Sequence, residues 1–299
     1  MAKGEWRSTT RLIETAINIL AKEFPMTIRQ LFYRLVSAVA IENCLRDYQR
    51  VSQVMTKARE DGRVPFEWIV DRSRVTYSSR GWTNLQALGD VLERTLVNYR
   101  RDYWQDQPHY VEIWCEKDAV TGSIEEIREE YGLSVEAIRG FNSTTNIHTA
   151  AMRLLQQKYD GKKIAIFYLG DWDPSGYDIE RDLRQRLALA GLGPFTPMGL
   201  RRIAIFREDI QKFRLPPLRV KNKDPRANGF KRRHGNEAVE LDALPPSELR
   251  ARLRRAIDAV IDRDAWNRAQ IVENAQRETC KRYAGVFRDM VSAEGDYAE

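Results

Sequence analysis

The sequence IAIFYLGDWDPSG, residues 164–176, begins as an apolar run and ends on two acidic side chains, Asp171 and Asp173. A continuous apolar run is typical of a central parallel strand that is covered on both faces. Ligands of such sheets bind just beyond the carboxyl ends of the strands. The stretch therefore predicts a parallel α/β sheet with a site for chemistry at this edge.

Magnesium suits such an edge, because it takes oxygen ligands, keeps several waters and needs only one or two carboxylates besides a substrate phosphate. The alternative interpretation is a plain turn at the end of a strand, since Asp, Pro, Ser and Gly are the ordinary turn residues. In both interpretations Ser175 is the candidate cap of the helix that follows.

A second strand pattern ends in the same way. Residues 109–115 (HYVEIWC) alternate apolar side chains, and Glu116, Lys117 and Asp118 follow them directly. Between the two strands the sequence predicts, in order, a helix from a capping box over residues 123–126, a short strand near 135–139 and a helix over 146–159. This alternation is typical of an α/β fold, and it brings carboxylates from two strands to one edge of the sheet.

Residues 27–38 (TIRQLFYRLVSA) predict an amphipathic helix with Tyr33 and Arg29 on the polar flank of its apolar stripe. A helical tyrosine usually packs in a core or an interface. Here an arginine one turn away can stabilise a phenolate or a phosphate, which favours Tyr33 as a nucleophile. Because the pKa of a phenol is about 10, attack at neutral pH needs help from cations, a base or a metal.

The segments WCEKDAV (114–120) and LGDWDPSG (169–176) together resemble the Toprim domain, whose signature is a Glu on one strand and Asp-x-Asp on a later one. The residues of these two segments are most similar to the Toprim half of the topoisomerase VI A subunit and of the related meiotic break-forming transesterases. That family carries a catalytic tyrosine on a preceding winged-helix domain, with an arginine four residues earlier and an aromatic residue immediately before. Arg29, Phe32 and Tyr33 match this pattern.

The resemblance implies a fold, a site and a reaction. The fold is a Toprim-type, Rossmann-like parallel sheet domain preceded by an all-α, winged-helix domain. Tyr33 is the nucleophile with Arg29 beside it, and Glu116, Asp171 and Asp173 hold Mg²⁺ or Mn²⁺. The reaction is topoisomerase VI A-like cleavage of double-stranded DNA through a 5′-phosphotyrosyl intermediate, by a homodimer in which tyrosine and metal come from opposite protomers.

Two alternatives stay open at this point. One is a Toprim nuclease that hydrolyses DNA with metal-activated water and has no covalent intermediate. The other is a non-catalytic DNA-binding or assembly factor. The chain also departs from the family pattern, because GFNSTTNIHTAAMR (140–153) stands where the family has a Gly-x-Pro-Asp loop, and only residues 1–26 precede the tyrosine helix. No P-loop occurs in the sequence, so an ATPase B-like subunit would be a separate polypeptide.

We expect three segments along the chain. Residues 1–80 form a winged-helix (CAP-like) DNA-binding domain with helices over 9–24, 27–38 and 47–61, although such a trihelical unit is also a common protein-protein module. Residues 81–106 form a linker helix. Residues 107–299 form the Toprim domain, with a basic loop and C-terminal helices.

Positive charge is concentrated in one stretch. Residues 201–234 contain 12 Lys and Arg against 3 Asp and Glu, whereas the whole chain contains 49 against 43. A basic loop beside a metal site is suited to DNA phosphates, and a solvated face is the alternative. The expected DNA contacts, including those outside this stretch, are Lys57, Arg59, Lys117, Lys221, Lys223, Arg226, Lys231, Arg232 and Arg233.

Residues 238–243 (AVELDA) have strand character, and ELDALPP (240–246) resembles a stretch of Toprim proteins in which an acidic residue lies near the metals. Glu240 or Asp242 is therefore a candidate further ligand, or equally a surface strand residue. The cysteines Cys44, Cys115 and Cys280 lack C-x-x-C spacing and indicate buried thiols of a reducing compartment. With no apolar signal or membrane-length run, we expect a cytoplasmic, nucleoid-associated protein with no membrane partner.

Overall fold

The structure is a computed structural model that describes residues 3–70, 81–138, 144–193, 199–221 and 224–295. It divides into two compact units, each treated separately below. The first unit consists of residues 1–74 and 109–260, and the second consists of residues 75–108 and 261–299.

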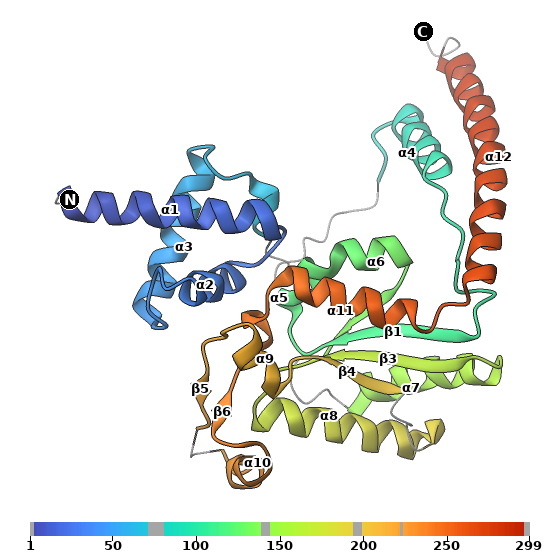
Figure 1. Ribbon diagram of the computed structural model, residues 1–299. Helices are drawn as coiled ribbons and strands as arrows, with labels where there is room; N and C mark the ends of the chain where they lie inside the picture. Colours follow the sequence, from blue (N-terminus) through green and yellow to red (C-terminus); the bar gives the residue numbers. More distant parts are fainter. Residues whose placement is uncertain (1–2, 71–80, 139–143, 194–198, 222–223, 296–299) are drawn as a thin grey trace. The chain divides into compact units, whose positions relative to one another are not determined.

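A four-stranded parallel sheet in the order β2-β1-β3-β4 forms the centre of the first unit (Figure 1). Its strands are β1 (His109–Cys115), β2 (Ser134–Ala137), β3 (Lys163–Leu169) and β4 (Leu200–Ala204). The predicted α/β class with a parallel sheet is therefore confirmed. β3 lies between β1 and β4, and its last five residues are buried, which explains the uninterrupted apolar run.

Strands β1 and β3 pair in register along their whole length, from His109 opposite Lys163 to Cys115 opposite Leu169. Both strands therefore end at the same level of the sheet. The backbone N–H of Glu116 continues the ladder by donating to the carbonyl of Leu169 at 2.9 Å. This register is what brings the residues after β1 and the residues after β3 to one edge.

Helices cover both faces of this sheet (Figure 1). On one face lie α7 (Thr144–Tyr159) and α8 (Pro174–Leu187), whose apolar side chains share a buried core with Trp114, Ile166 and Tyr168 of the sheet. On the other face lie α5 (Asp118–Thr121), η2 (Gly122–Ile124), α6 (Glu125–Tyr131) and α11 (Pro246–Asp258). The alternating side chains of β1 and β3 thus fill two apolar layers.

The capping box expected at residues 123–126 is not formed. Helix α6 begins without a side-chain cap, and the hydroxyl of Ser123 donates to Oε1 of Gln30 at 2.6 Å instead. A buried partner from another helix therefore outcompetes the local motif. The capping box of the first unit is at Thr27, where Thr27 and Gln30 bond reciprocally and start the tyrosine helix.

The N-terminal part of the first unit contains α1 (Lys3–Glu23), α2 (Ile28–Ser37), α3 (Leu45–Glu60) and the short η1 (Phe66–Trp68). The three α-helices contact one another pairwise, as the sequence predicts for a trihelical unit. The extended piece after α3 pairs with Met26, whose carbonyl accepts from the N–H of Val70 at 3.0 Å. Predicted Lys223 and the end of the predicted first domain lie outside the described residues.

Much of the basic stretch is regular structure rather than loop. After η3 (Ala188–Leu192) and β4, the chain forms α9 (Arg207–Lys212), the antiparallel pair β5 (Leu218–Arg219) and β6 (Glu237–Ala238), α10 (Ala227–His234) between them, and η4 (Leu241–Ala243). The strand predicted over residues 238–243 is wrong beyond Ala238, apart from one bridge between Val239 and Trp172. Leu241 turns away because its N–H donates to the carboxylate of Asp171 at 2.7 Å.

The second unit is a pair of helices, α4 (Leu85–Val97) and α12 (Arg263–Gly295), that pack along each other. Glu273 of α12 accepts from the backbone N–H of Arg101 at 2.9 Å, and the rings of Tyr103 and Trp104 meet Trp266 edge to face. The sequence analysis assigns the C-terminal helices to the Toprim domain, whereas the structure groups α12 with α4 in the second unit. A helical pattern does not indicate which element the helix packs against.

Two further observations bear on the sequence predictions. Among the described residues, none of the helices combines the length and the apolar character that a membrane span requires. All three cysteines are free thiols; Cys115 is buried, whereas Cys44 and Cys280 are partly exposed.

Candidate functional site

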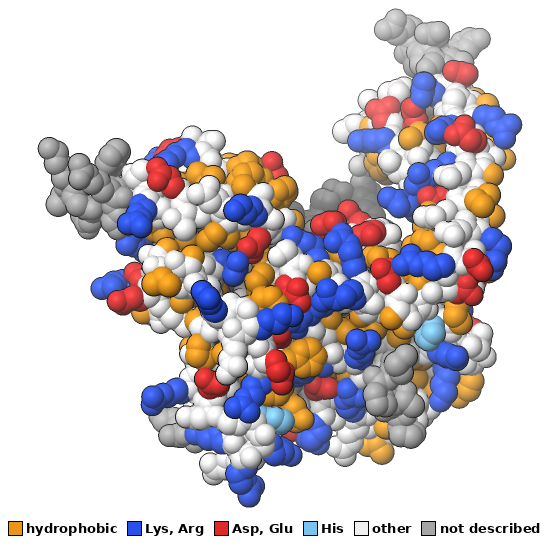
Figure 2. All heavy atoms as spheres, viewed as in Figure 1, with side chains coloured by type: hydrophobic (Ala, Val, Ile, Leu, Met, Phe, Trp, Pro, Cys, Tyr) orange, Lys and Arg blue, Asp and Glu red, His pale blue; other side chains and the backbone are white. Residues whose placement is uncertain are grey.

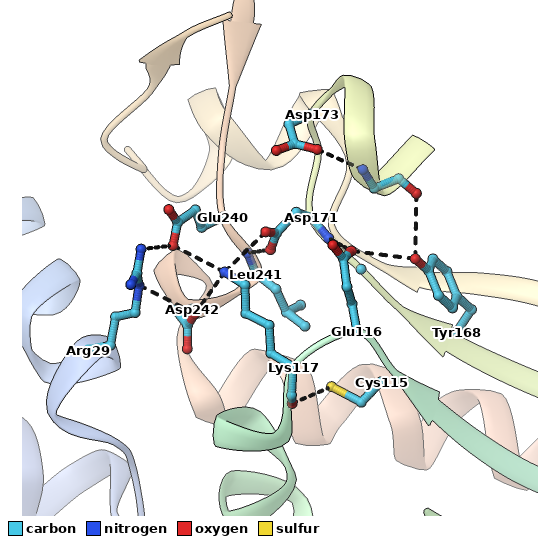
Figure 3. A network of polar contacts seen from close by, with 12 residues as sticks. Arg29, Cys115, Glu116, Lys117, Tyr168, Asp171, Asp173, Glu240, Leu241 and Asp242 are labelled. Carbon is cyan, nitrogen blue, oxygen red and sulfur yellow. Dashed lines mark hydrogen bonds and ion pairs between the residues drawn. The ribbon is translucent and has the colours of Figure 1, made fainter. Parts of the chain in front are cut away.

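The carboxyl ends of β1 and β3 bring together the residues that the two strand motifs single out (Figure 3). The backbone N–H of Asp171 donates to Oε2 of Glu116 at 3.0 Å, so the side chain after β1 is held against the backbone after β3. The hydroxyl of Tyr168 lies 3.4 Å from the same Oε2. Asp171 is 7% exposed and Glu116 is half-buried, so both carboxylates have little access to water.

Asp173 starts helix α8. Its Oδ1 accepts from the N–H of Gly176 at 2.7 Å, and Pro174 occupies the first helical turn, where the missing N–H does no harm. The predicted cap Ser175 is therefore wrong, because the aspartate two residues earlier already fills that role. One oxygen of Asp173 is engaged by the helix, and the side chain as a whole stays partly exposed.

Gly176 makes this close arrangement possible. A Cβ at that position would stand 2.5 Å from the carbonyl oxygen of Asp171 and 3.0 Å from Oε2 of Glu116. Real Cβ atoms do not approach backbone oxygens so closely, so only glycine fits between the two acidic residues. The DWDPSG motif is thus a tight cradle in which three carboxylates follow two adjacent strands.

The electrostatics of this cradle are unfavourable for a buried anion. Burial, and then the negative charge of Asp171, raise the pKa of Glu116 to about 7. Burial also raises the pKa of Asp171 to about 6, although Lys117 opposes the shift. Both shifts have the same leading cause, which is that the carboxylates are removed from water. Lys117 offsets this cost in part at Asp171.

Lys117 links Asp171 of the cradle to two further carboxylates, Glu240 and Asp242. Its Nζ lies 3.0 Å from Asp171, 3.1 Å from Glu240 and 3.0 Å from Asp242 (Figure 3). Burial alone would lower the pKa of Lys117, but these carboxylates, with Asp242 first, outweigh it and hold the pKa above its usual value. The DNA contact expected of Lys117 stays a prediction, and in this structure its ammonium is neutralised by acidic groups.

Arg29 joins helix α2 to the same cluster. Its guanidinium forms an ion pair with Glu240 and lies 3.7 Å from Asp242. The two acidic residues of ELDALPP therefore face Lys117 and Arg29. Oδ1 of Asp242 is buried and has no hydrogen-bond partner among the described residues, so Asp242 keeps an oxygen available to a further cation.

Tyr33 lies beside Arg29 but is less accessible than its helical position indicates. The tyrosine is 5% exposed, and the Arg29 guanidinium lies 5.9 Å from the ring centroid. Burial, and then the charge of Glu240, raise the pKa of Tyr33 to about 12, against the opposing effects of Arg29 and Lys117. On the predicted polar flank, Arg29 is therefore exposed whereas Tyr33 is buried. Tyr33 and Arg29 line a cavity of about 280 Å³ together with Phe32, Asn43, Cys44, Leu45 and Tyr48.

A cluster of two acidic residues and a cysteine near that cavity was not expected from the sequence. Among the described residues, Glu42, Cys44 and Asp47 are the group whose ligand atoms all lie within 4.8 Å of one another, and the predicted triad is not so contracted. Asp47 already accepts from the N–H of Glu42 at 3.0 Å. Acidic groups of this kind are common at helix starts, so we assign no function to it.

Apart from Lys117, the predicted DNA contacts that the structure describes fall into two sets. On α3, Lys57 pairs with Asp61 at 2.8 Å and Arg59 stacks on Phe66, so both have partners within the chain. The rest are near β5, β6 and α10, where Figure 2 shows Lys and Arg side chains gathered. Arg226 pairs with Asp224 at 2.9 Å. The others described there are Lys221, Lys231, Arg232 and Arg233.

A cluster of aromatic side chains packs α10 against the cradle. Trp172, which stands between the two aspartates, lies 5.7 Å from Phe230 and 5.1 Å from His234 in edge-to-face contacts, and Tyr177 lies 4.5 Å from His234. The basic helix is thereby joined to the strand end that carries Asp171 and Asp173. Lys221 lines a cavity of about 240 Å³ whose walls include Asp173 and Glu240.

The donors present fit a hard divalent cation. All are carboxylate oxygens, and the cradle around Gly176 is too close for any side chain, which holds the acidic residues after β1 and β3 together. Glu116, Asp171 and Asp173 are the residues that would hold such an ion. Sequence reasoning missed two other residues of this edge, because Trp172 is the unspecified middle residue of Asp-x-Asp and the buried Arg202 stands in no motif.

No protein-family model matches this chain, and no curated protein matches it. The functional argument therefore depends on the motifs and on the geometry of the site.

Proposed function

We propose that this protein is a Toprim-type, topoisomerase VI A-like enzyme that cleaves double-stranded DNA by tyrosine transesterification. The observation that carries the proposal is a continuous series of contacts from the candidate nucleophile to the candidate metal ligands. Tyr33 contacts Arg29, Arg29 pairs with Glu240, and Glu240 shares the ammonium of Lys117 with Asp171. Helix α2 and the ends of β1 and β3 thus converge on one site.

The arrangement of elements supports the finer parts of the proposal. A Glu directly after β1 and Asp-x-Asp after the adjacent parallel β3 are the positions that a Toprim domain requires. The three mutually packed helices α1 to α3 support a winged-helix domain that addresses DNA. The basic helix α10, held beside the cradle by Trp172, supports contact with DNA phosphates.

A bound Mg²⁺ or Mn²⁺ ion on Glu116, Asp171 and Asp173 would supply polarisation of the scissile phosphate and stabilisation of the leaving oxygen. Tyr33 performs the covalent step. Its Oη bonds to phosphorus, the bond between phosphorus and the 3′ oxygen breaks, the phenolic proton passes to solvent, and the released oxygen takes up a proton as a 3′-hydroxyl. The DNA then carries a 5′-phosphotyrosyl link, and Arg29 neutralises charge at the phosphate.

The partners and the site of action are part of the same proposal. Cleavage of both strands needs two copies of the site, so we propose a homodimer. The resemblance implies that tyrosine and carboxylates come from opposite protomers, whereas the contacts above join them within one chain, and the mixed dimers described below distinguish the two arrangements. An ATPase B-like subunit would have to be supplied separately for strand passage. We propose that the enzyme acts in the cytoplasm on the nucleoid.

Cleavage of supercoiled plasmid with Mg²⁺ or Mn²⁺, stopped with detergent and analysed with and without protease, tests the proposal. Wild type should give linear DNA that enters the gel only after proteolysis. Tyr33→Phe and Asp171→Ala should lose this product by at least about 10³-fold, because the first removes the nucleophile and the second removes a ligand of the metal. Tyr48→Phe is the matched control, since Tyr48 lines the same cavity, and it should cut like wild type.

Two other results would contradict the proposal. Protease-independent cutting that survives Tyr33→Phe and is lost in Asp171→Ala would show a hydrolytic nuclease. No cutting with either metal would leave a DNA-binding or assembly factor.

A metal-dependent nuclease is the second candidate, and one observation favours it. Tyr33 is buried and its pKa is raised, so the phenol is protonated and covered in this conformation. Hydrolysis would need only the carboxylates and water. Mixed dimers of Tyr33→Phe and Asp171→Ala protomers distinguish the two mechanisms. If transesterification uses tyrosine and carboxylates from opposite protomers, the mixed dimer contains one intact site and should nick DNA covalently.

A further inference from the structure

Arg202, on strand β4, is a charged side chain in the interior of the first unit. The residue is 9% exposed, and it lies in the strand that pairs with β3 on the side away from β1. A buried guanidinium is unfavourable unless its donors are satisfied. Its partners therefore indicate why it is there.

The donors of Arg202 reach both ends of the loop that carries the two aspartates. Nη1 donates to the carbonyl of Gly170 at 2.9 Å and to that of Asp171 at 3.1 Å. Nη2 donates to the carbonyl of Gly176 at 3.2 Å. One planar group thus joins the point where the chain leaves β3 to the first turn of α8, with Asp171 and Asp173 between them.

The guanidinium is itself fixed from two sides. Its Nε donates to Glu180 of α8 at 2.7 Å, one turn beyond the loop. Its carbon lies 5.1 Å from the ring centroid of Tyr168, whose hydroxyl is 3.4 Å from Glu116. Arg202 therefore binds the backbone of Asp171 itself and that of Gly176, whose N–H donates to Asp173. It reaches Glu116 only through the ring of Tyr168.

This arrangement opposes a specific strain. The cradle holds Glu116 and Asp171 side by side with little access to water, and repulsion between like charges tends to separate the strand ends that carry them. A fork of fixed donors on three carbonyls resists that separation. Lysine, with one point charge and no planar fork, cannot bond to all three carbonyls and Glu180 together.

We propose that Arg202 is a positioning residue for the divalent-cation site, which holds the 170–176 loop at the spacing that lets Glu116, Asp171 and Asp173 bind one ion. This inference rests on the proposed function, since it assigns a role to Arg202 at that same site. Arg202 touches neither the ion nor DNA, and its effect passes through the carbonyls that it binds.

Direct Mn²⁺ binding tests the inference without relying on catalysis. Free Mn²⁺ is measured by electron paramagnetic resonance during titration of wild type, Arg202→Lys, Asp171→Ala and Arg252→Lys. Arg202→Lys should raise the Kd for Mn²⁺ by about 10–100-fold, the effect typical of residues that orient metal ligands. At saturating Mn²⁺ its cleavage rate should stay within about threefold of wild type.

Arg252→Lys is the matched control. Arg252 is another largely buried arginine of the same unit, held by Asp209 at 2.8 Å and by Glu248 at 2.8 Å, and it makes no contact with the loop. Its variant should leave the Kd for Mn²⁺ unchanged. Glu180→Gln, which keeps Arg202 but weakens its anchor, should raise the Kd by a smaller factor.

The outcomes separate the two proposals. If wild type does not bind Mn²⁺, or if Asp171→Ala binds it equally well, the proposed function fails at its metal site. If wild type binds Mn²⁺ through Asp171 and Arg202→Lys binds it with the same Kd, the inference about Arg202 is overturned. Should Arg202→Lys not fold, as judged by circular dichroism, the Kd of Glu180→Gln decides: a rise supports the inference and an unchanged value overturns it.

Discussion

Two glutamates four residues apart, Glu112 within strand β1 and Glu116 directly after it, are in opposite electrostatic situations. Glu112 is 1% exposed and accepts two hydrogen bonds from Arg153, at 2.7 and 3.0 Å, together with one from Trp114 at 2.8 Å. Burial alone would raise its pKa, but these donors and Tyr110 outweigh burial and hold the pKa below its usual value. Glu116 instead faces Asp171, and its pKa is raised to about 7.

The difference teaches how to distinguish a structural carboxylate from a functional one. Glu112 has a complete set of partners within the chain, so it needs nothing from outside. Glu116 accepts from an amide and lies near the Tyr168 hydroxyl, but no arginine or lysine neutralises it within hydrogen-bond distance among the described residues. Burial without compensation indicates a place where a ligand must supply the missing charge.

The largest expected effect is on cleavage. Glu116→Gln should reduce the rate of plasmid cutting at saturating Mn²⁺ by about 10³-fold, equivalent to about 4 kcal/mol, because it removes a charged oxygen donor. Glu112→Gln, assayed at a temperature where it is folded, should cut at a rate within about threefold of wild type. Equal losses in the two variants would erase the distinction between the two glutamates.

The second expected effect is on stability, where Glu112→Gln rather than Glu116→Gln should be the more damaging variant. Glu112→Gln should lower the free energy of unfolding by about 2–4 kcal/mol, since it leaves Arg153 and buried donors without their anion. Glu116→Gln should change it by less than about 1 kcal/mol or increase it, because it relieves repulsion from Asp171. Urea unfolding at pH 8 without divalent metal measures both. A larger loss for Glu116→Gln would contradict the comparison.

The smallest expected effect is a pH dependence of the Glu112 contribution. A lowered pKa in the folded state means that the unfolded chain binds the proton more readily, so the contribution is fully present above the ordinary glutamate pKa of 4.5 and is lost as the pH falls through the folded value. The stability difference between wild type and Glu112→Gln should therefore shrink between pH 7 and pH 3. A difference that is constant over this range would show that Glu112 acts through packing alone.

The sequence predicts the edge of the sheet well because local pattern determines it. The apolar run 164–169 and the alternation of 109–115 define two strands, and parallel pairing alone brings the residues after them together. Arg202 could not be found in this way, since its value depends on carbonyls in a neighbouring loop. Ser123 shows the reverse case, in which a satisfactory local motif gives way to a buried partner, Gln30.

The helix of Tyr33 marks the limit of periodicity arguments. The pattern places Tyr33 and Arg29 together on a polar flank, yet Arg29 is exposed whereas Tyr33 is 5% exposed and lines a cavity with residues 43–45 and Tyr48. A helical pattern gives the direction of a side chain but not what lies opposite. The same limit applies to α12, whose pattern predicts a helix and does not indicate that it packs on α4.

Gly176 determines how the loop tolerates substitution. Because a single methyl group there would meet the carbonyl oxygen of Asp171 at 2.5 Å, alanine is already too large, and every larger residue repeats the same collision. At the neighbouring Ser175, which is partly exposed, the ordinary ranking by chemical similarity applies. In a saturation library of this loop, side-chain volume alone would decide which residues are tolerated at position 176, and only glycine, which has no side chain, would be accepted.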